Sequence, residues 1–274
     1  MNLIKAELLK IRTTSLWWVF ALILIPLWAL SLLANWGTTN ATSGADQGSL
    51  DPDQAAQVRA AGEAINIATN LYTSGQFLGV LLVLLLSAIV VTNEFFHLTA
   101  TTTFLTTPVR ERVILAKLVA AVVVGLAFWA LTTILNLIFV PFILDALNVG
   151  SQIGEPGVWR AIGLNALAFG LWAIVGVGAG VLIRSQIAAT ITLSVLYLVG
   201  TSGAGIIFFL LAEYVAKWFE KLQVLVPTTA SQLMISGTEL PGNPPRWVGA
   251  VVLIGYALVT GVLGTAIMKR RDIS

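Results

Sequence analysis

The chain has 274 residues, of which 57% are hydrophobic and 10% are charged, and its mean hydropathy is +0.91. Soluble globular domains carry about 25% charged residues, so this composition predicts an integral membrane protein. The chain contains no cysteine, which excludes disulfides and thiolate metal sites, and its net charge of +2 comes from scattered basic residues that do not predict nucleic-acid binding.

The N-terminal stretch 1–12 is basic and has a helical pattern. Ile4, Leu8 and Ile11 recur at helical spacing and share one face, with the cations elsewhere around the helix. Such a helix can lie in the membrane interface with its apolar face buried. An ordinary basic flank of the first membrane span explains the same residues, and both interpretations stay open.

The first long apolar run covers residues 16–36 and is long enough to cross about 30 Å of hydrocarbon. Trp17, Trp18 and Trp36 fall near its ends, where indole rings favour the membrane interface. A signal peptide is the alternative, because basic residues precede the run. The run exceeds the usual apolar core of about 7–15 residues, which favours a retained span.

Five more apolar runs follow the first. A polar stretch at 37–70, with a helical region at 53–68, is expected to form a loop on the outer side of the membrane. The other predicted spans are 71–92, 113–144, 158–183, 187–211 and 247–268. Pro141 is expected to break or kink the last turns of the third span.

The fourth predicted span is rich in glycine. Its glycines are Gly163, Gly170, Gly176, Gly178 and Gly180. The GVGAG sequence resembles a nucleotide-binding loop, but no strand precedes it and no Lys-Ser or Lys-Thr follows it. Small residues in membrane helices more often let neighbouring backbones approach, so we expect close helix packing here.

The stretch 212–226 differs from the apolar runs around it. Glu213, Lys217 and Lys221 repeat every four residues, and aromatic and aliphatic side chains fill the remaining positions. This pattern predicts an amphipathic interfacial helix with a Glu213–Lys217 pair, followed by a short piece at 228–237 that completes an outer hairpin. The residues that define this hairpin are Glu213, Trp218, Phe219 and Pro227.

The basic residues are divided unequally between the two sides of a six-span arrangement. With both termini inside, the inner cations are Lys5, Lys10, Arg12, Arg110, Arg112, Lys117, Arg184, Lys269, Arg270 and Arg271, and the outer ones are Arg59, Arg160, Lys217, Lys221 and Arg246. The positive-inside rule requires such an excess. The sequence therefore predicts a single all-α integral membrane domain over 1–274, in the cell membrane, with cytoplasmic N- and C-termini.

The predicted spans carry no recognisable catalytic or motor motif. Their interiors contain no ionisable residues, which argues against a proton relay or a charged channel ring. The HExxH, GxSxG and P-loop motifs are absent, and a lone His97 does not make a metal site. We therefore expect a transport subunit and not an enzyme. The alternatives are a membrane assembly or sensor protein without a motor and, less favoured, a membrane-embedded enzyme.

The polar segment 93–117 interrupts the apolar sequence between the second and third predicted spans. Glu94 and His97 follow the second span directly, and six threonines, which are weak helix formers, come after them. Phe104 and Leu105 add apolar side chains to this polar stretch. Such a segment needs a partner to hold it in a helix, which indicates a docking element for a soluble protein.

Pro108 suits the first position of a new helix that leads into the third span. Arg110, Arg112 and Lys117 would then mark the cytoplasmic entry of that span. A solvated turn whose charges anchor two spans explains the same residues, and the residues alone favour neither interpretation.

Several short motifs occur in this segment and near the end of the chain. They are Glu94, His97, Thr99, Leu105, Pro108, Arg110, Arg112 and Ala116-Lys117-Leu118, then Leu225-Val226-Pro227, Ala230-Ser231 and Arg271-Asp272. Together with the six spans and the basic N-terminus, they resemble the membrane subunits of ABC-2-type transporters over the whole chain. Leu98 departs from the pattern, because the family often has glycine there, which puts the start of the local helix in doubt.

The resemblance implies a permease half of an ATP-binding-cassette exporter. It would pair with a second, like permease half around the first and fifth spans and with two cytosolic ATPase subunits that use ATP, while the chain itself binds no cofactor. The implied ATPase-docking residues of a cytoplasmic coupling helix are Glu94, His97, Thr99, Phe104, Leu105, Pro108 and Arg110. The implied substrate is hydrophobic or amphipathic, such as a drug, a peptide or a lipid. The resemblance also implies that membrane lipid contacts the chain.

Overall fold

A computed structural model of the chain describes residues 3–43, 52–97, 110–239 and 243–270, and these residues form only helices and their connections. The helices are α1 (Leu3–Thr13), α2 (Leu16–Ser43), α3 (Pro52–Ala61), α4 (Ala64–Tyr72), α5 (Gln76–Phe96), α7 (Arg110–Ala146), α8 (Pro156–Ile183), α9 (Gln186–Tyr214), the 3₁₀ helix η2 (Lys217–Leu225), α10 (Pro227–Ile235) and α11 (Arg246–Arg270). Six regions of the described chain are long and apolar enough to cross a membrane, which confirms the predicted all-α, six-span fold.

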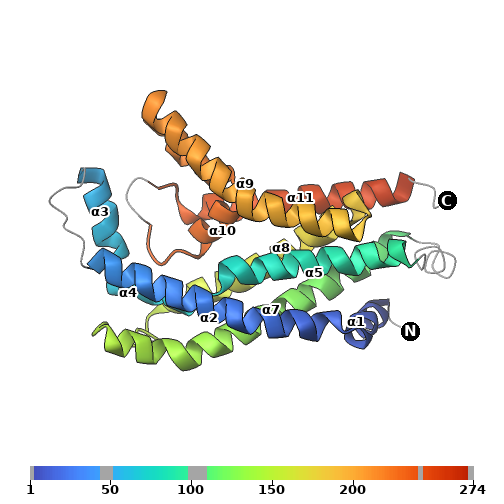
Figure 1. Cartoon of the computed structure of the whole chain (residues 1–274), viewed down its shortest axis with the longest axis horizontal. Coiled ribbons are helices and arrows are strands. Elements are labelled where there is room, and N and C mark those ends of the chain that lie inside the picture. The colour runs from blue at the N-terminus through green and yellow to red at the C-terminus, as the bar shows by residue number, and fades with distance from the viewer. Residues whose placement is uncertain (1–2, 44–51, 98–109, 240–242, 271–274) are drawn as a thin grey trace.

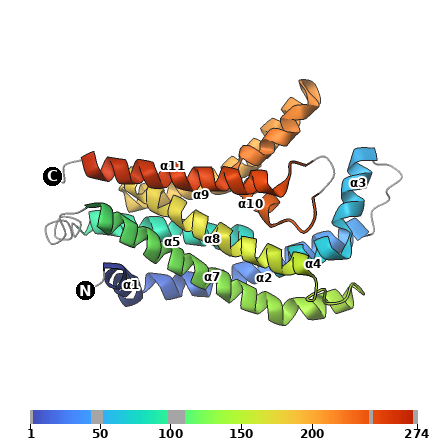
Figure 2. The ribbon, with the colours of Figure 1, turned by 180° about the vertical axis from the view of Figure 1, so that it is seen from behind.

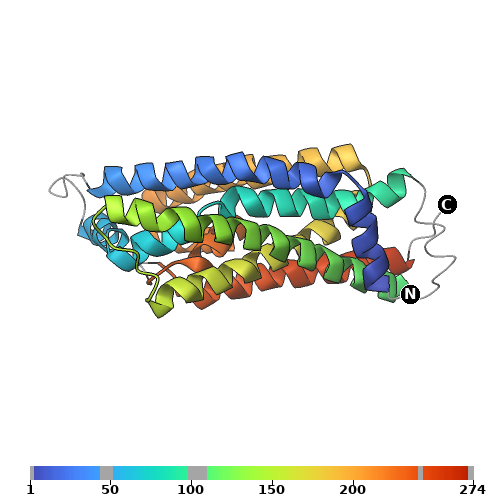
Figure 3. The same cartoon turned by 90° about the horizontal axis from the view of Figure 1, so that it is seen from below.

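The long helices lie side by side in three layers (Figure 1). In Figures 1 and 2, α9 and α11 lie on one side of α5 and α8, and α2 and α7 lie on the other. α9 packs mainly against α5, and α11 packs mainly against α8. The N- and C-termini lie at the same end of the bundle. At that end α1 turns away from α2 and lies across the bundle towards the start of α7 (Figure 3).

The hydrophobic core surrounds α5 and α8. In the most apolar 18-residue stretch of each span, the share of buried residues is 78% in Ala64–Phe96 and 67% in α8, but only 6% in α9. α9 also leans away from the other helices in its C-terminal part (Figures 1 and 2). The outward apolar face of α9 is therefore available to lipid or to another protein subunit.

The glycine run of α8 packs against helices on two sides. A Cβ on Gly180 would lie 2.8 Å from the carbonyl oxygen of Ala88 in α5, and one on Gly178 would lie 2.5 Å from that of Thr260 in α11. By contrast, a Cβ on Gly163 would meet nothing within 4 Å. The prediction of close packing is confirmed for the end of the run and is wrong for Gly163.

The second span differs from the predicted range 71–92. It starts earlier, with α4, and the helix is interrupted between Tyr72 and Gln76 before it continues as α5. Gly75 adopts a left-handed φ of 87°, which a residue with a side chain rarely adopts. The predicted range missed this interruption, although the polar run Thr73-Ser74-Gly75-Gln76 between apolar residues is a local turn signal.

Asn136 of α7 stabilises the interruption. Its Nδ2 donates hydrogen bonds to the carbonyl oxygens of Tyr72 and Ser74, both at 2.9 Å, and its Oδ1 accepts one from Trp28 Nε1 at 2.7 Å. Asn136 is completely buried. Because backbone groups inside a membrane protein must find partners within the protein, this one amide replaces helix bonds lost at the interruption.

Three other helix boundaries also differ from the predicted ones. The helix of the first span continues beyond Trp36 to Ser43, and within it the hydroxyl groups of Thr38 and Thr39 donate hydrogen bonds to the Asn35 carbonyl oxygen. The predicted outer helix 53–68 is divided at Gly62–Glu63 into α3 and α4. The third span extends to Ala146 with Pro141 inside it, so Pro141 does not end this helix.

The contact between α8 and α11 can be tested with one added side chain. Gly178→Val places two methyl groups against the Thr260 carbonyl, and we expect a loss of about 1–3 kcal/mol from overpacking. Gly163→Val is the matched control on the same helix, where open space should leave stability unchanged. Thermal unfolding of the purified chain in detergent measures both, and equal melting temperatures for the two variants would contradict the packing.

Candidate functional site

Four charged side chains meet where α1 crosses the ends of α5 and α7. Lys117 Nζ lies 2.7 Å from Glu7 Oε2 and 2.5 Å from Glu94 Oε1. Lys10 Nζ lies 2.8 Å from Glu7 Oε1 and 2.8 Å from Glu94 Oε1. Each carboxylate therefore bonds both ammonium groups, and the two charges of each sign balance. We call Glu7, Lys10, Glu94 and Lys117 the terminal ion cluster.

The terminal ion cluster is buried on one side and open on the other. The side chains of Lys117, Glu7 and Glu94 are 1%, 5% and 11% exposed, whereas that of Lys10 is 45% exposed. Burial lowers the pKa of Lys10, but its hydrogen bonds to Glu7 and Glu94 and their charges raise it by more, so the net pKa lies above its ordinary value. Lys10 therefore stays charged at neutral pH and helps to neutralise both carboxylates.

The burial of Lys117 corrects its predicted place at the membrane surface. Lys117 lies about two turns into α7, which begins at Arg110, and its ammonium group is enclosed by protein. Glu111 and Arg112, one or two turns earlier, are the exposed charges at this helix end. A buried ammonium group is costly unless it is paired, and the two carboxylates supply that pairing.

Sequence reasoning missed Glu7 entirely. It predicted that Ile4, Leu8 and Ile11 form the buried face of the N-terminal helix, but the buried residues of α1 are Glu7 and Ile11, whereas Ile4 and Leu8 are half-buried. The available signal was Lys117, a cation within an apolar span whose charge needs a carboxylate at the same end of the bundle. The N-terminal helix itself is confirmed.

The structure separates the predicted docking residues. Glu94 points inward to the terminal ion cluster, whereas His97 is exposed, with its ring 5.0 Å from that of Phe96. Arg110 begins α7. The other predicted docking residues, Thr99, Phe104, Leu105 and Pro108, lie outside the described residues. Docking therefore stays a prediction for all seven.

The turn between α8 and α9 lies at the same end of the bundle. Arg184 has a positive φ of 57° and its guanidinium carbon lies 5.4 Å from the centre of the Phe95 ring. Ser185 then accepts a hydrogen bond from the Ala188 N–H and caps the start of α9. The cation–π contact joins this turn to the end of α5.

The outer hairpin differs from its predicted form. α9 continues to Tyr214, the chain becomes extended at Ala216, and Lys217–Leu225 forms the 3₁₀ helix η2. The predicted Glu213–Lys217 pair is wrong as a helical pair, because the two residues lie on different elements. The apolar pattern continues across Val215 and Ala216, so it could not show where the helix ends.

The rest of the hairpin follows the prediction more closely. Pro227 occupies the first turn of α10, which packs against α8 and α11. Trp218 and Phe219 stack with ring centres 4.2 Å apart, and Trp218 is exposed. An exposed aromatic pair at the end of a membrane bundle suits the membrane interface.

Among the described residues, no group of three or more His, Cys, Asp or Glu side chains could hold a metal ion. The terminal ion cluster has two carboxylates, each already bonded by two ammonium groups. Its arrangement suits a neutral joint between α1, α5 and α7 better than a site for an ion or a reacting group.

In comparisons with known proteins, no family model matches the chain, and no curated protein is significantly similar to it. The fold and the site define its class as a multi-span, all-α membrane protein.

The terminal ion cluster predicts a large effect for one substitution. Lys117→Met leaves two buried carboxylates with Lys10 alone, and we expect a destabilisation of roughly 3–5 kcal/mol. Arg112→Met, which removes an exposed cation from the same helix, is the control and should have little effect. Thermal unfolding in detergent distinguishes the two variants.

A second substitution separates charge pairing from packing. The Lys117→Met variant has two carboxylates and one ammonium group in the cluster. Adding Glu94→Gln removes the excess negative charge, so the double variant should regain part of the lost stability. A double variant less stable than Lys117→Met would contradict the charge-pairing role.

Proposed function

We propose that the chain is the membrane subunit of an ATP-driven exporter, similar to the ABC-2-type permeases that its motifs resemble. Separate cytosolic ATPase subunits would supply the energy, and the chain would form half of the pathway. The observation that carries this proposal is the terminal ion cluster, because it joins α1 to α5 and α7, the two helices that the predicted docking segment 93–108 connects.

The cluster gives a route for force from a docked protein. α5 leads into the docking segment and α7 leads out of it, and Glu94 and Lys117 bond these two helices to each other. Glu7 bonds α1 to the same lysine. A push on the docking segment would therefore move the three helix ends as one body, as coupling between distant sites requires.

The first span lies next along this route. Only Thr14 and Ser15 separate α1 from α2, so a displacement of α1 is passed directly to the first span. α2 exposes apolar side chains over much of its length, among them Leu22, Leu30 and Leu33. In this proposal α2 and α9 face a second permease half, and rocking of the two halves opens the pathway.

The charge distribution supports a cytoplasmic position for the end that carries the termini. Lys5, Arg12, Arg112 and Arg184 lie at this end in exposed or partly exposed positions. Over the whole sequence, ten of the 15 Lys and Arg residues fall on this side of the six-span arrangement and five on the other, and the positive-inside rule favours the cytoplasm for the side with the excess. The opposite end would then release a hydrophobic or amphipathic substrate outside the cell membrane.

The proposal is tested by recovery of an ATPase with the chain. The tagged chain is co-expressed with the ATP-binding-cassette ATPase encoded nearest to its gene and purified in mild detergent. We expect the two proteins to co-purify, and the combined Phe104→Ala and Leu105→Ala variant to lose the ATPase while it still inserts into the membrane. Quantitative immunoblotting of both proteins measures the ratio.

Phe142→Ala is the matched control, because it removes an exposed aromatic side chain from the far end of α7. It should retain the ATPase at the level of the unchanged chain. Failure of the unchanged chain to recover the ATPase would overturn the proposed function. If the double Phe104→Ala and Leu105→Ala variant recovers as much ATPase as the unchanged chain, this segment is not the docking element.

A further inference from the structure

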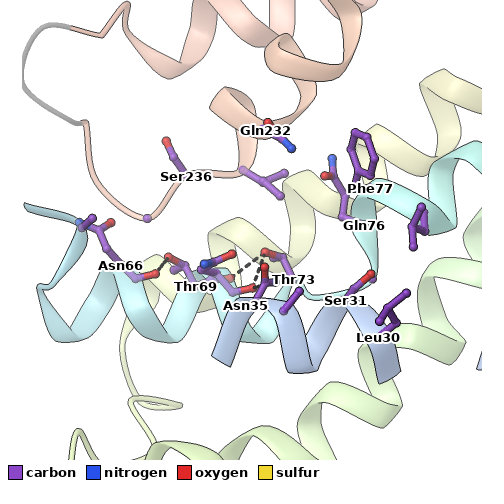
Figure 4. Close-up of a pocket in the computed structure, with 17 residues that line it drawn as sticks. Leu30, Ser31, Asn35, Asn66, Thr69, Thr73, Gln76, Phe77, Gln232 and Ser236 are labelled. Atoms are coloured by element: carbon purple, nitrogen blue, oxygen red, sulfur yellow. Dashed lines mark hydrogen bonds between the residues drawn. The ribbon is translucent and has the colours of Figure 1, made fainter. Parts of the chain in front are cut away.

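A cavity lies at the end of the bundle opposite the termini. It has a volume of about 650 Å³ and lies between α2, the interrupted second span and α10. Figure 4 shows Gln232 and Ser236 across the cavity from Asn35, Thr69 and Thr73. This volume falls within the range of pockets that bind small molecules, about 300–1,000 Å³.

The lining is polar but carries no charge. Nine of the 17 lining residues have hydroxyl or carboxamide side chains: Ser31, Asn35, Asn66, Thr69, Asn70, Thr73, Gln76, Gln232 and Ser236. The remaining lining residues are apolar, and none is Asp, Glu, Lys, Arg or His. Arg160 and Arg246 donate hydrogen bonds to the carbonyl oxygens of Ser236 and Gly237 but are not themselves lining residues. A charged ligand would therefore lose water with no counter-ion in the lining itself, which is unfavourable.

Some of these polar groups hold the cavity walls together. Asn35 Nδ2 donates to Ser74 Oγ at 2.8 Å and joins α2 to the interruption of the second span. Gln76 Nε2 donates to Ser231 Oγ at 2.5 Å and joins α5 to α10. Hydrogen bonds between segments far apart in the sequence therefore hold the walls of the cavity in place.

Other polar groups remain available to a ligand. Asn70 and Gln232 are exposed in the cavity wall, and within the described chain their side-chain amides have no hydrogen-bond partner. Each amide offers two N–H donors and one acceptor oxygen, a set that matches hydroxyl and amide groups. They come from α4 and α10, so one ligand can bond both walls.

The apolar part of the lining lies to one side. In Figure 4 Leu30 and Phe77 lie at the opposite side of the cavity from Asn66. Leu30 of α2 and Phe77 in the first turn of α5 give this side of the cavity two large apolar side chains. A ligand with a polar head and an apolar tail would therefore place its tail against them.

We propose that this cavity binds an uncharged amphiphile whose head group carries several hydroxyl or amide groups, as in an alkyl glycoside. The head would bond Asn70 and Gln232, and the tail would contact Leu30 and Phe77. Transport of such a ligand rests on the proposed function, whereas its binding does not.

The absence of cysteine from the chain allows a direct test. Ala34→Cys introduces a single thiol at an exposed lining position that the proposal does not assign to binding, in the purified chain held in lipid nanodiscs without any ATPase. Octyl glucoside should slow maleimide labelling about tenfold at ten times its Kd, because the unoccupied fraction falls as 1/(1 + [L]/Kd). Octyl sulfate, with the same tail and a charged head, should leave the rate unchanged.

Two controls keep the result specific. Ser151→Cys places a thiol at an exposed position outside the lining, where octyl glucoside should not alter labelling. In the Ala34→Cys background, Asn70→Leu should abolish the protection, whereas Asn40→Leu, an exposed position on α2 outside the cavity, should preserve it.

Each outcome bears on the proposal. Absence of protection by octyl glucoside, equal protection by octyl sulfate, or protection that survives Asn70→Leu would overturn it. Protection in a chain that recovers no ATPase would uphold the binding site and reject only the proposed function. Loss of protection in a chain that does recover the ATPase would reject only the binding site.

Discussion

The position of one buried lysine constrains how the helices meet at the end that carries the termini. Lys117 lies inside the third span, where an unpaired ammonium group would be very costly. Glu94 pairs with it from the second span and Glu7 from the N-terminal helix, and Lys10 completes the charge balance. Three segments far apart in the sequence must therefore converge at this point, and α1 lies across the bundle because its carboxylate is needed there.

A similar constraint acts at the opposite end, with hydrogen bonds in place of charges. The interrupted second span exposes backbone carbonyls that Asn136 must satisfy, and Trp28 fixes the orientation of that amide. Asn70, in the last turn of α4, and Thr73, at the interruption, line the polar cavity. Between the two ends, the glycines of α8 bring α5 and α11 close enough to form the core. The bundle thus has a charged joint at one end and an uncharged polar cavity at the other.

These two ends give the proposed function a physical basis. An exporter subunit needs a stiff connection from a docked motor to its spans, and a site that accepts its substrate. In the proposed function, the ion cluster would provide the first through α1, α5 and α7, and the proposed binding cavity would provide the second. The two sites also differ in what they tolerate: the joint depends on charge balance, whereas the cavity depends on the absence of charge.

The sequence by itself determined the all-α class, the six apolar spans and the polar segment between the second and third, because length and hydropathy are local properties of the chain. It also indicated that the end of the glycine run in α8 would pack closely. Only the tertiary structure decided the partners of Lys117, the role of Asn136 and the presence of Gln232 and Asn70 in the lining of one cavity. Each of these depends on side chains more than 20 residues apart, and no local pattern records which of the scattered polar residues will meet.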